Sequence, residues 1–190
     1  MISHKHKIVF VHPNKCGGNS VEAFFEGESH KRIHKRHMRL KGYKNKYPEE
    51  FENYFKFAFT RNPFDRLVSV FHGRVQGKMV PRNKTLAELG FTESIKSGHI
   101  FKFCKTQVGH YFNLRNKDGT IPLDFIGRVE NYQKDFNIVC DKIGIPHQQL
   151  PHKNASKHKH YTEYYNDETK QIVAEKYAKD IEYFNYEFGE

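Results

Sequence analysis

KIVFVHPNKCGGNSVEAFFEG (residues 7–27) joins a short apolar run to an amphipathic run through a loop that contains two adjacent glycines. The β-branched and aromatic residues of the first run predict a buried strand. The second run predicts a helix from Ser20 to Gly27. A helix N-terminus presents free backbone N–H groups and the positive end of the helix dipole. A strand, a tight turn and a helix in this order therefore predict an anion-binding loop.

The loop also carries side chains suited to an anion. Lys15 adds a full positive charge, and Ser20 adds a hydroxyl donor. Gly17 and Gly18 lack a Cβ, so the backbone there can approach a ligand closely. The usual nucleotide loop reads G-x-x-x-x-G-K-[ST], with the lysine last, whereas Lys15 precedes both glycines. Taken alone, the two glycines are equally consistent with a flexible turn.

A second stretch, FKFAFTRNPFDRLVS (residues 55–69), predicts another strand followed directly by a helix. Asn62 is a favourable N-cap, and Pro63 suits the first helical position. Arg61 then stands at the carboxyl end of the strand, where open parallel α/β sheets bind ligands. Ser69 lies two turns further along, off the apolar stripe of the helix. Two anion sites at adjacent strand ends predict one ligand with two phosphate-like groups; a salt bridge for Arg61 and a solvated Ser69 are the structural alternatives.

The remaining segments continue the alternation of strands and helices. A third strand is predicted at 123–130, helices are predicted at 47–55, 131–146 and 167–184, and loops with short helices are predicted at 77–120. This order implies an α/β fold with a parallel sheet flanked by helices. A length of 190 residues without a linker or repeat predicts a single domain over residues 1–190.

Composition limits the partners and the compartment. The formal net charge of +10 at pH 7 predicts attraction to anions such as nucleic acid, acidic polysaccharide or a polyphosphate ligand. The three cysteines form neither a disulfide framework nor a zinc spacing, so we expect a reducing compartment. No apolar run approaches about 18 residues, and no signal peptide precedes the first strand. We therefore expect a cytoplasmic protein without a membrane span.

HPNKCGGNS (residues 12–20) together with residues 55–69 resembles the Golgi-type and bacterial carbohydrate sulfotransferases, which use 3′-phosphoadenosine 5′-phosphosulfate (PAPS). Their first motif reads H-I-P-K-T-G-G-T-S, and their second reads R-N-P-x-D-R-L-V-S. Cys16 and Asn19 stand where threonines are usual. Later segments of the chain also look like that family, so the resemblance spans nearly all 190 residues. It implies a P-loop NTPase-like three-layer fold with a central parallel sheet.

The resemblance assigns cofactor-binding residues to two phosphate groups. The 5′-phosphosulfate would be held by Lys15, the backbone of Cys16, Gly17, Gly18 and Asn19, and the Ser20 hydroxyl. Arg61 and Ser69 would hold the 3′-phosphate, the group that separates PAPS from ATP. Lys157, before the last helix, would close over the cofactor. Lys15 would also neutralise the departing 5′-phosphate of the product, 3′,5′-adenosine bisphosphate (PAP); this family needs no metal.

Transfer of the sulfuryl group is expected to be an in-line displacement with little covalent work for the protein. The acceptor hydroxyl needs a base, and histidine suits that task near neutral pH. Among 13 histidines, His34 and His37 lie between the two motifs, where the resembling family carries its base. His37 matches that spacing better and is the predicted base. Glu130 is the second candidate, and a solvated histidine in a basic loop is the structural alternative.

Residues 30–46 are almost all basic and contain no acidic residue. The predicted acceptor-binding residues are Arg32, Lys35, Arg36 and Arg39, which suit an acidic oligo- or polysaccharide. A nucleic-acid patch is the alternative interpretation. The sequence contains neither an RNA-binding aromatic motif nor helix-turn-helix spacing, so we expect no nucleic-acid partner.

The leading hypothesis is a PAPS-dependent sulfotransferase that modifies a carbohydrate hydroxyl. A P-loop kinase or NTPase is the second hypothesis, although the position of Lys15 and the lack of an evident Mg²⁺ ligand argue against it. A non-catalytic domain that binds polyanions or nucleic acid is the third. The acceptor's identity, the hydroxyl position and the oligomeric state leave no mark in the sequence.

Overall fold

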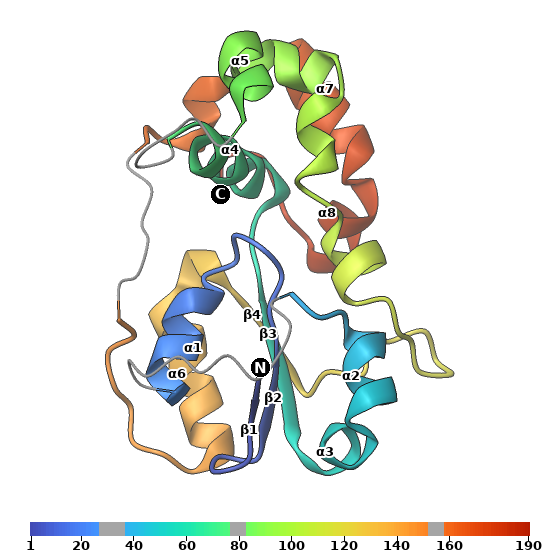
Figure 1. Cartoon of the computed structure of the whole chain (residues 1–190), viewed down its shortest axis with the longest axis vertical. Coiled ribbons are helices and arrows are strands. Elements are labelled where there is room, and N and C mark those ends of the chain that lie inside the picture. The colour runs from blue at the N-terminus through green and yellow to red at the C-terminus, as the bar shows by residue number, and fades with distance from the viewer. Residues whose placement is uncertain (27–36, 77–82, 152–157) are drawn as a thin grey trace. The chain divides into compact units, whose positions relative to one another are not determined.

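The computed structural model describes residues 1–26, 37–76, 83–151 and 158–190 of the chain. These residues group into two compact units (Figure 1). The first unit comprises Met1–Arg61 and Gln107–Asn154, and the second comprises Asn62–Thr106 and Ala155–Glu190. That the two units together act as one sulfotransferase domain stays a prediction.

The first unit is built on a four-stranded sheet. In spatial order its strands are β1 (Ile2–Ser3), β2 (Ile8–Val11), β3 (Phe55–Thr60) and β4 (Phe125–Arg128). Strands β2, β3 and β4 are parallel, with Phe57 opposite both Phe10 and Phe125. Strand β1 pairs antiparallel with β2 and is too short to leave a sequence pattern. The three predicted strands are confirmed, and the sheet is mostly parallel.

Helices cover both faces of this sheet. They are α1 (Gly18–Glu26), α2 (Leu40–Lys46), α3 (Pro48–Asn53) and α6 (Tyr132–Ile143). Figure 1 shows α1 and α6 on one face of the sheet and α2 and α3 on the other. Buried phenylalanines of the strands pack with Val21 of α1 and with Phe136 and Val139 of α6. The predicted three-layer α/β arrangement is confirmed, and α6 ends at Ile143, just before Gly144, whose φ is 71°.

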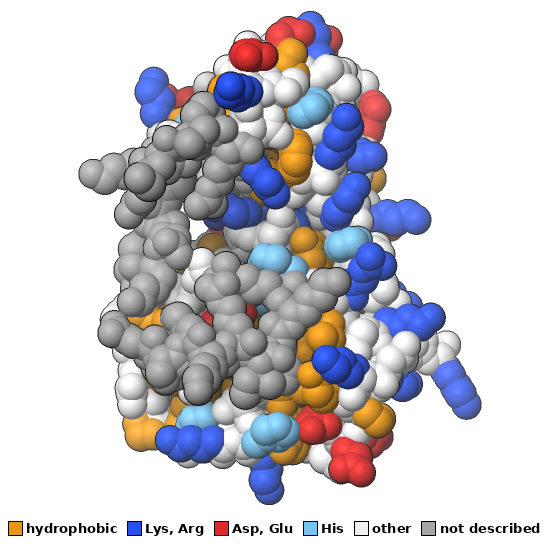
Figure 2. Space-filling model, in the orientation of Figure 1, with side chains coloured by type: hydrophobic (Ala, Val, Ile, Leu, Met, Phe, Trp, Pro, Cys, Tyr) orange, Lys and Arg blue, Asp and Glu red, His pale blue; other side chains and the backbone are white. Residues whose placement is uncertain are grey.

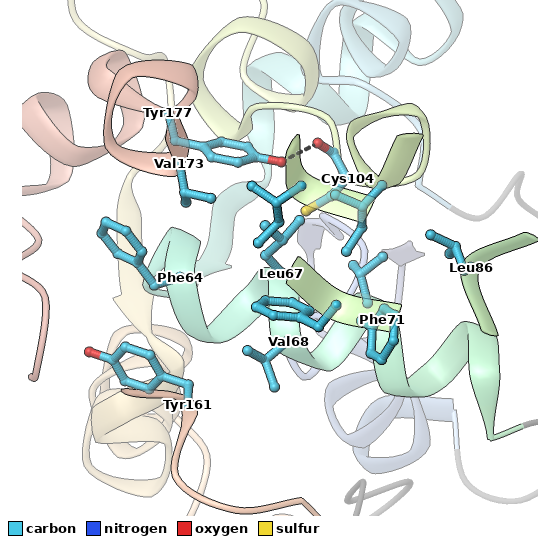
Figure 3. Close-up of a cluster of buried hydrophobic side chains, with 13 residues drawn as sticks. Phe64, Leu67, Val68, Phe71, Leu86, Cys104, Tyr161, Val173 and Tyr177 are labelled. Atoms are coloured by element: carbon cyan, nitrogen blue, oxygen red, sulfur yellow. Dashed lines mark hydrogen bonds between the residues drawn. The ribbon is translucent and has the colours of Figure 1, made fainter. Parts of the chain in front are cut away.

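The second unit is mainly helical. Its helices are α4 (Pro63–Val75), α5 (Lys84–Lys96), α7 (Asp167–Lys176) and α8 (Ala178–Phe184). Figure 3 shows Leu67, Val68 and Phe71 of α4 within a cluster of buried hydrophobic side chains. The Tyr177 hydroxyl donates a hydrogen bond of 2.6 Å to the Cys104 carbonyl in the same cluster.

Three predictions about the elements can be compared with the structure in detail. The helix predicted over 167–184 is interrupted at Tyr177, whose ψ of 19° ends α7 before α8 begins. Within 77–120, where loops with short helices were predicted, α5 consists of two short helical stretches that meet at Gly90, whose φ of 72° is not helical. Glu130 does not end the third strand, because β4 stops at Arg128 and Glu130 lies in the 3₁₀ turn Val129–Asn131.

Positive charge is distributed widely over the surface. Lys and Arg side chains are spread across the face drawn in Figure 2, among fewer acidic ones. This agrees with the 32 basic and 22 acidic residues of the sequence. No helix in the described parts of the chain is long and apolar enough to cross a membrane.

Candidate active site

The loop between β2 and α1 has a tightly turned backbone. Lys15 and Gly17 both have positive φ, 64° and 70° respectively. The Ser20 N–H donates to the Gly17 carbonyl at 2.9 Å. Helix α1 starts at Gly18, two residues earlier than predicted, so the loop residues run directly into the helix N-terminus. A helix N-terminus favours an anionic ligand, because its N–H groups and the positive end of the helix dipole point toward the loop.

Both glycines are required by neighbouring side chains. A Cβ on Gly17 would lie 2.5 Å from the ring of Tyr132, and a Cβ on Gly18 would lie 2.0 Å from the ring of His12. Gly17 also has a φ of 70°, which disfavours any other residue. The sequence analysis explained these glycines by close approach of a ligand. The structure adds a second reason: the ring of Tyr132 lies close to Gly17, and the ring of His12 lies close to Gly18. A turn that is merely flexible would not require these two contacts.

Tyr132 contacts the loop, although the sequence predicted only a helix at its position. It is the first residue of α6, and its hydroxyl donates to the Gly17 carbonyl at 2.6 Å. Burial raises the pKa of Tyr132, and a hydrogen bond with the Ser20 side chain opposes that rise. The hydroxyl therefore stays protonated and remains a donor to the loop.

Arg61 reaches the same loop from the next strand. It follows the last residue of β3, and its guanidinium donates to the Lys15 carbonyl at 3.2 Å. The predicted convergence of Lys15 and Arg61 is therefore present within the first unit. The Arg61 side chain, the Lys15 backbone and the N-terminus of α1 therefore lie together at one edge of the sheet.

Gln107 was missed by the sequence analysis altogether. It is fully buried, and its amide bonds both to the Arg61 backbone and to Cys16 in the loop. It begins the short π-helical turn Gln107–Tyr111, inside the segment that the sequence predicted only as loops and short helices. No local motif marks it, because its partners lie far away in the sequence.

His37 lies beside the end of β2. Its Nδ1 is 2.9 Å from the carbonyl oxygen of His12, and the two imidazole rings are 4.5 Å apart between centroids. A carbonyl oxygen only accepts, so Nδ1 carries a hydrogen, and in the neutral ring the lone pair is on Nε2. This tautomer is the one that a base acting through Nε2 requires.

His12 itself is held by an acidic partner. Its Nδ1 is 2.9 Å from Glu22 Oε1 of α1, and its ring stacks on Phe10. His12 is buried, with 4% of its surface exposed. These contacts indicate a structural role for His12 at the end of β2.

Ser69 belongs to the second unit and is buried in α4, with 2% of its surface exposed. Arg66, on the same side of the predicted helix, is also buried, and its guanidinium donates to the Lys105 carbonyl at 2.8 Å. The alternative of a solvated position for Ser69 is therefore wrong, because α4 is covered beyond its apolar stripe.

Several predicted site residues lie outside the described part of the chain. They are Arg32, His34, Lys35, Arg36 and Lys157. Of the predicted acceptor-binding residues, Arg39 is described: it is exposed and directly precedes α2. Lys159, near Lys157 in the sequence, pairs with Glu163 at 3.3 Å on the surface of the second unit. Within the described ranges, no three His, Cys, Asp or Glu side chains are grouped as a metal site.

A glycine-containing loop at a helix N-terminus, next to Arg61 at the end of a strand in a mostly parallel sheet, makes this an α/β protein of the P-loop-like class. The chain belongs to the sulfotransferase family, whose model matches residues 1–187.

Two individual proteins are similar to this chain. An uncharacterized protein of Archaeoglobus fulgidus is 34% identical over 97 residues, which are 50% of this chain and 72% of that protein. The crystal structure of mouse sulfotransferase SULT7A1 complexed with PAP is similar with a TM-score of 0.55 and 15% sequence identity. The match covers 95% of this chain and 85% of the mouse chain. At that identity the likeness concerns the fold, and it confirms the predicted P-loop NTPase-like fold.

Proposed function

We propose that this sulfotransferase moves a sulfuryl group from PAPS to a hydroxyl of an acidic carbohydrate. The observation that carries the proposal is the contact of the Arg61 guanidinium with the Lys15 carbonyl, at 3.2 Å. It joins two cationic residues beside one helix N-terminus, and a ligand with two phosphate groups on one nucleoside suits such a donor set. The PAP complex of the structurally similar mouse enzyme supports the same ligand class.

Bound PAPS would supply an activated sulfuryl group, whose S–O bond to the 5′-phosphate breaks as a new S–O bond to the acceptor forms. Lys15 and the N–H groups of residues 16–19 hold the 5′-phosphosulfate, with the Ser20 hydroxyl as a further donor. Lys15 neutralises the negative charge that develops on the 5′-phosphate. Arg61 binds the 3′-phosphate. The assignments of Ser69 to that phosphate and of Lys157 to a covering loop stay predictions.

His37 takes the acceptor's proton through Nε2. The hydrogen bond from Nδ1 to the His12 carbonyl supports this role because it fixes both the tautomer and the ring orientation. Glu130 stays the second candidate. It lies in a 3₁₀ turn of the first unit, after the end of β4.

The acceptor is proposed to be acidic because the protein is strongly basic, with a net charge of +10. The exposed side chain of Arg39, which precedes α2, is suited to the rim of such an acceptor site. A screen of uronic-acid polymers, neutral oligosaccharides and small alcohols with radiolabelled PAPS tests this part. Preferential sulfation of a small alcohol would contradict it. The cytoplasmic location stays a prediction.

Calorimetric titration with PAP, AMP and ATP tests the cofactor assignment. The protein should bind PAP much more tightly than AMP or ATP. Arg61→Ala should weaken PAP binding by about 2–4 kcal/mol, because it removes a charge-assisted phosphate contact. The same change should affect AMP much less, since AMP lacks the 3′-phosphate. Equal losses for PAP and AMP would remove Arg61 from the 3′-phosphate site.

A further inference from the structure

The Gln107 side chain connects the anion loop to the end of β3. Its Oε1 accepts from the Arg61 N–H at 3.0 Å, and its Nε2 donates to the Arg61 carbonyl at 2.9 Å. Oε1 also lies 3.3 Å from the Cys16 sulfur. A single amide therefore holds both backbone groups of Arg61 and one side chain of the loop.

Chemistry leaves this amide only one orientation. The Arg61 N–H can only donate, and the Arg61 carbonyl can only accept, so Oε1 must face the former and Nε2 the latter. Oε1 can then accept from the S–H of Cys16, whose sulfur lies 3.3 Å away, closer than it lies to the Asn14 carbonyl at 3.7 Å. Because Gln107 is fully buried, leaving these backbone groups without partners would be costly.

Gln107, Arg61 and the loop residues Lys15 and Cys16 are joined in a ring of hydrogen bonds. Gln107 fixes the Arg61 backbone, the Arg61 guanidinium donates to the Lys15 carbonyl, and Cys16, next to Lys15, bonds back to Gln107. The side chain of Arg61 is therefore anchored at its base by Gln107 and at its tip by the loop. A shift of the Arg61 backbone would move the guanidinium relative to any phosphate beside the loop.

We infer that Gln107 is a positioning residue, which sets the place of the Arg61 guanidinium for the 3′-phosphate of the cofactor. The inference rests on the proposed function. It assigns part of the discrimination between PAP and AMP to a residue that touches neither ligand. A purely structural role would instead affect the binding of both ligands equally, because both share the loop.

The test compares Gln107→Leu with wild-type protein in calorimetric titrations of PAP and of AMP. The dissociation constant for PAP should rise roughly 10- to 100-fold, since a displacement of about 1 Å at a positioned group has effects of this size. The dissociation constant for AMP should change less than about threefold. Gln107→Met keeps the unbranched length and should give the same result if the leucine variant fails to fold.

Gln133 provides a matched control within the same unit. Its Oε1 accepts from the Leu150 N–H at 2.9 Å, and its Nε2 donates to the Gln148 carbonyl at 3.1 Å. Gln133→Leu thus removes a similar pair of hydrogen bonds, to the Leu150 N–H and the Gln148 carbonyl, at a place away from the loop. It should leave the ratio of the PAP and AMP dissociation constants unchanged.

The outcomes separate the inference from the proposed function. If wild-type protein prefers PAP and Gln107→Met leaves that preference intact, or weakens both ligands equally, the positioning role is overturned and the function stands. If wild-type protein shows no preference for PAP, the proposed function fails and the role of Gln107 fails with it. A loss of preference in the Gln107 variants, but not in Gln133→Leu, supports the inference.

Discussion

Lys15 combines an important charge with an unfavourable backbone conformation. Its φ of 64° lies in the left-handed region, which costs an L-residue about 1–2 kcal/mol. The tight turn between β2 and α1 imposes this conformation. The carbonyl of Lys15 accepts from the Arg61 guanidinium, in addition to the role that we propose for the Lys15 ammonium group.

Replacement of Lys15 separates charge from backbone strain. Lys15→Ala and Lys15→Gly both remove the ammonium group, so each should lower the rate of sulfuryl transfer by about 10²-fold or more. PAP binding should weaken less, because the charge acts mainly on the departing phosphate. Single-turnover kinetics and calorimetry measure the two effects. Lys15→Gly should unfold at a higher temperature than Lys15→Ala, and normal turnover in either variant would remove Lys15 from the mechanism.

His37 can be tested against two other histidines. His37→Ala should lose about 10²–10⁴-fold in turnover, the usual contribution of a positioned base. Its affinity for PAP should stay nearly unchanged. His147→Ala is a control, because His147 is exposed and pairs with Asp141 at 2.7 Å on the surface. His34→Ala should lose far less turnover than His37→Ala. A larger loss in His34→Ala would identify His34 as the base instead. If both variants keep their turnover, Glu130 is the next residue to mutate.

The site residues that the sequence revealed are those inside local motifs. Lys15, the two glycines and Arg61 stand in short patterns next to predicted strands and helices. Gln107 and Tyr132 reach the same place through side-chain hydrogen bonds that span 46 and 115 residues. Contacts at such separations leave no period or spacing in a single sequence, so only the structure could supply these residues.

At the scale of elements, α4 shows how strongly a helix start can be specified. The Asn62 side chain accepts from the Phe64 N–H at 3.1 Å, and Pro63 occupies the first turn, as predicted. The buried amide also donates to the Glu187 carbonyl at 2.7 Å, a contact that no local pattern indicates. The N-cap thus stabilises α4 and also binds the C-terminal segment of the same unit.

Asn62→Ala should lower the free energy of unfolding by about 2–3 kcal/mol, through the lost cap and the unpaired carbonyl of Glu187. Asn83 is a matched control, because it caps α5 by accepting from the Leu86 N–H at 3.0 Å. Asn83→Ala should cost only about 1 kcal/mol. Urea denaturation measures both, and equal losses would show that the contact with Glu187 contributes nothing.

Elements with a clear period or a strong cap were predictable, and the others were not. Strands β2, β3 and β4 follow from their apolar runs, and α4 and α6 follow from their caps and periods. Strand β1 is only two residues long, and Gly90 divides α5 into two short helical stretches. The division of the last predicted helix depends on Tyr177, whose hydroxyl binds the distant Cys104 carbonyl.

At the scale of the whole molecule, the net charge of +10 predicts salt-dependent recognition of the acceptor. The Michaelis constant for an acidic polymer should rise with ionic strength, because the Debye length falls to about 8 Å at 0.15 M salt. Combined neutralisation of Arg32, Lys35, Arg36 and Arg39 should raise the Michaelis constant for the acidic polymer roughly 10-fold. It should also make this constant less dependent on salt concentration. PAP affinity should stay nearly constant, and a neutral oligosaccharide is the control substrate. Equal competition by duplex DNA would mean that this charge does not select the acceptor.

The hydrogen-bonded pair of Arg61 and Gln107 also bears on how the family can diverge. The two residues are 46 positions apart, and the segment between them, Asn62–Thr106, belongs to the second unit. The hydrogen bonds of Gln107 to Arg61 therefore join the two ends of this segment. The entropic cost of bringing the ends of a chain segment together rises slowly with its length, by about 0.6 kcal/mol for each doubling. A few residues added to this segment should therefore change the free energy of bringing Arg61 and Gln107 together very little. We expect the hydrogen bonds between these two residues, and with them the backbone at Lys15, to tolerate such additions where α4 is left intact.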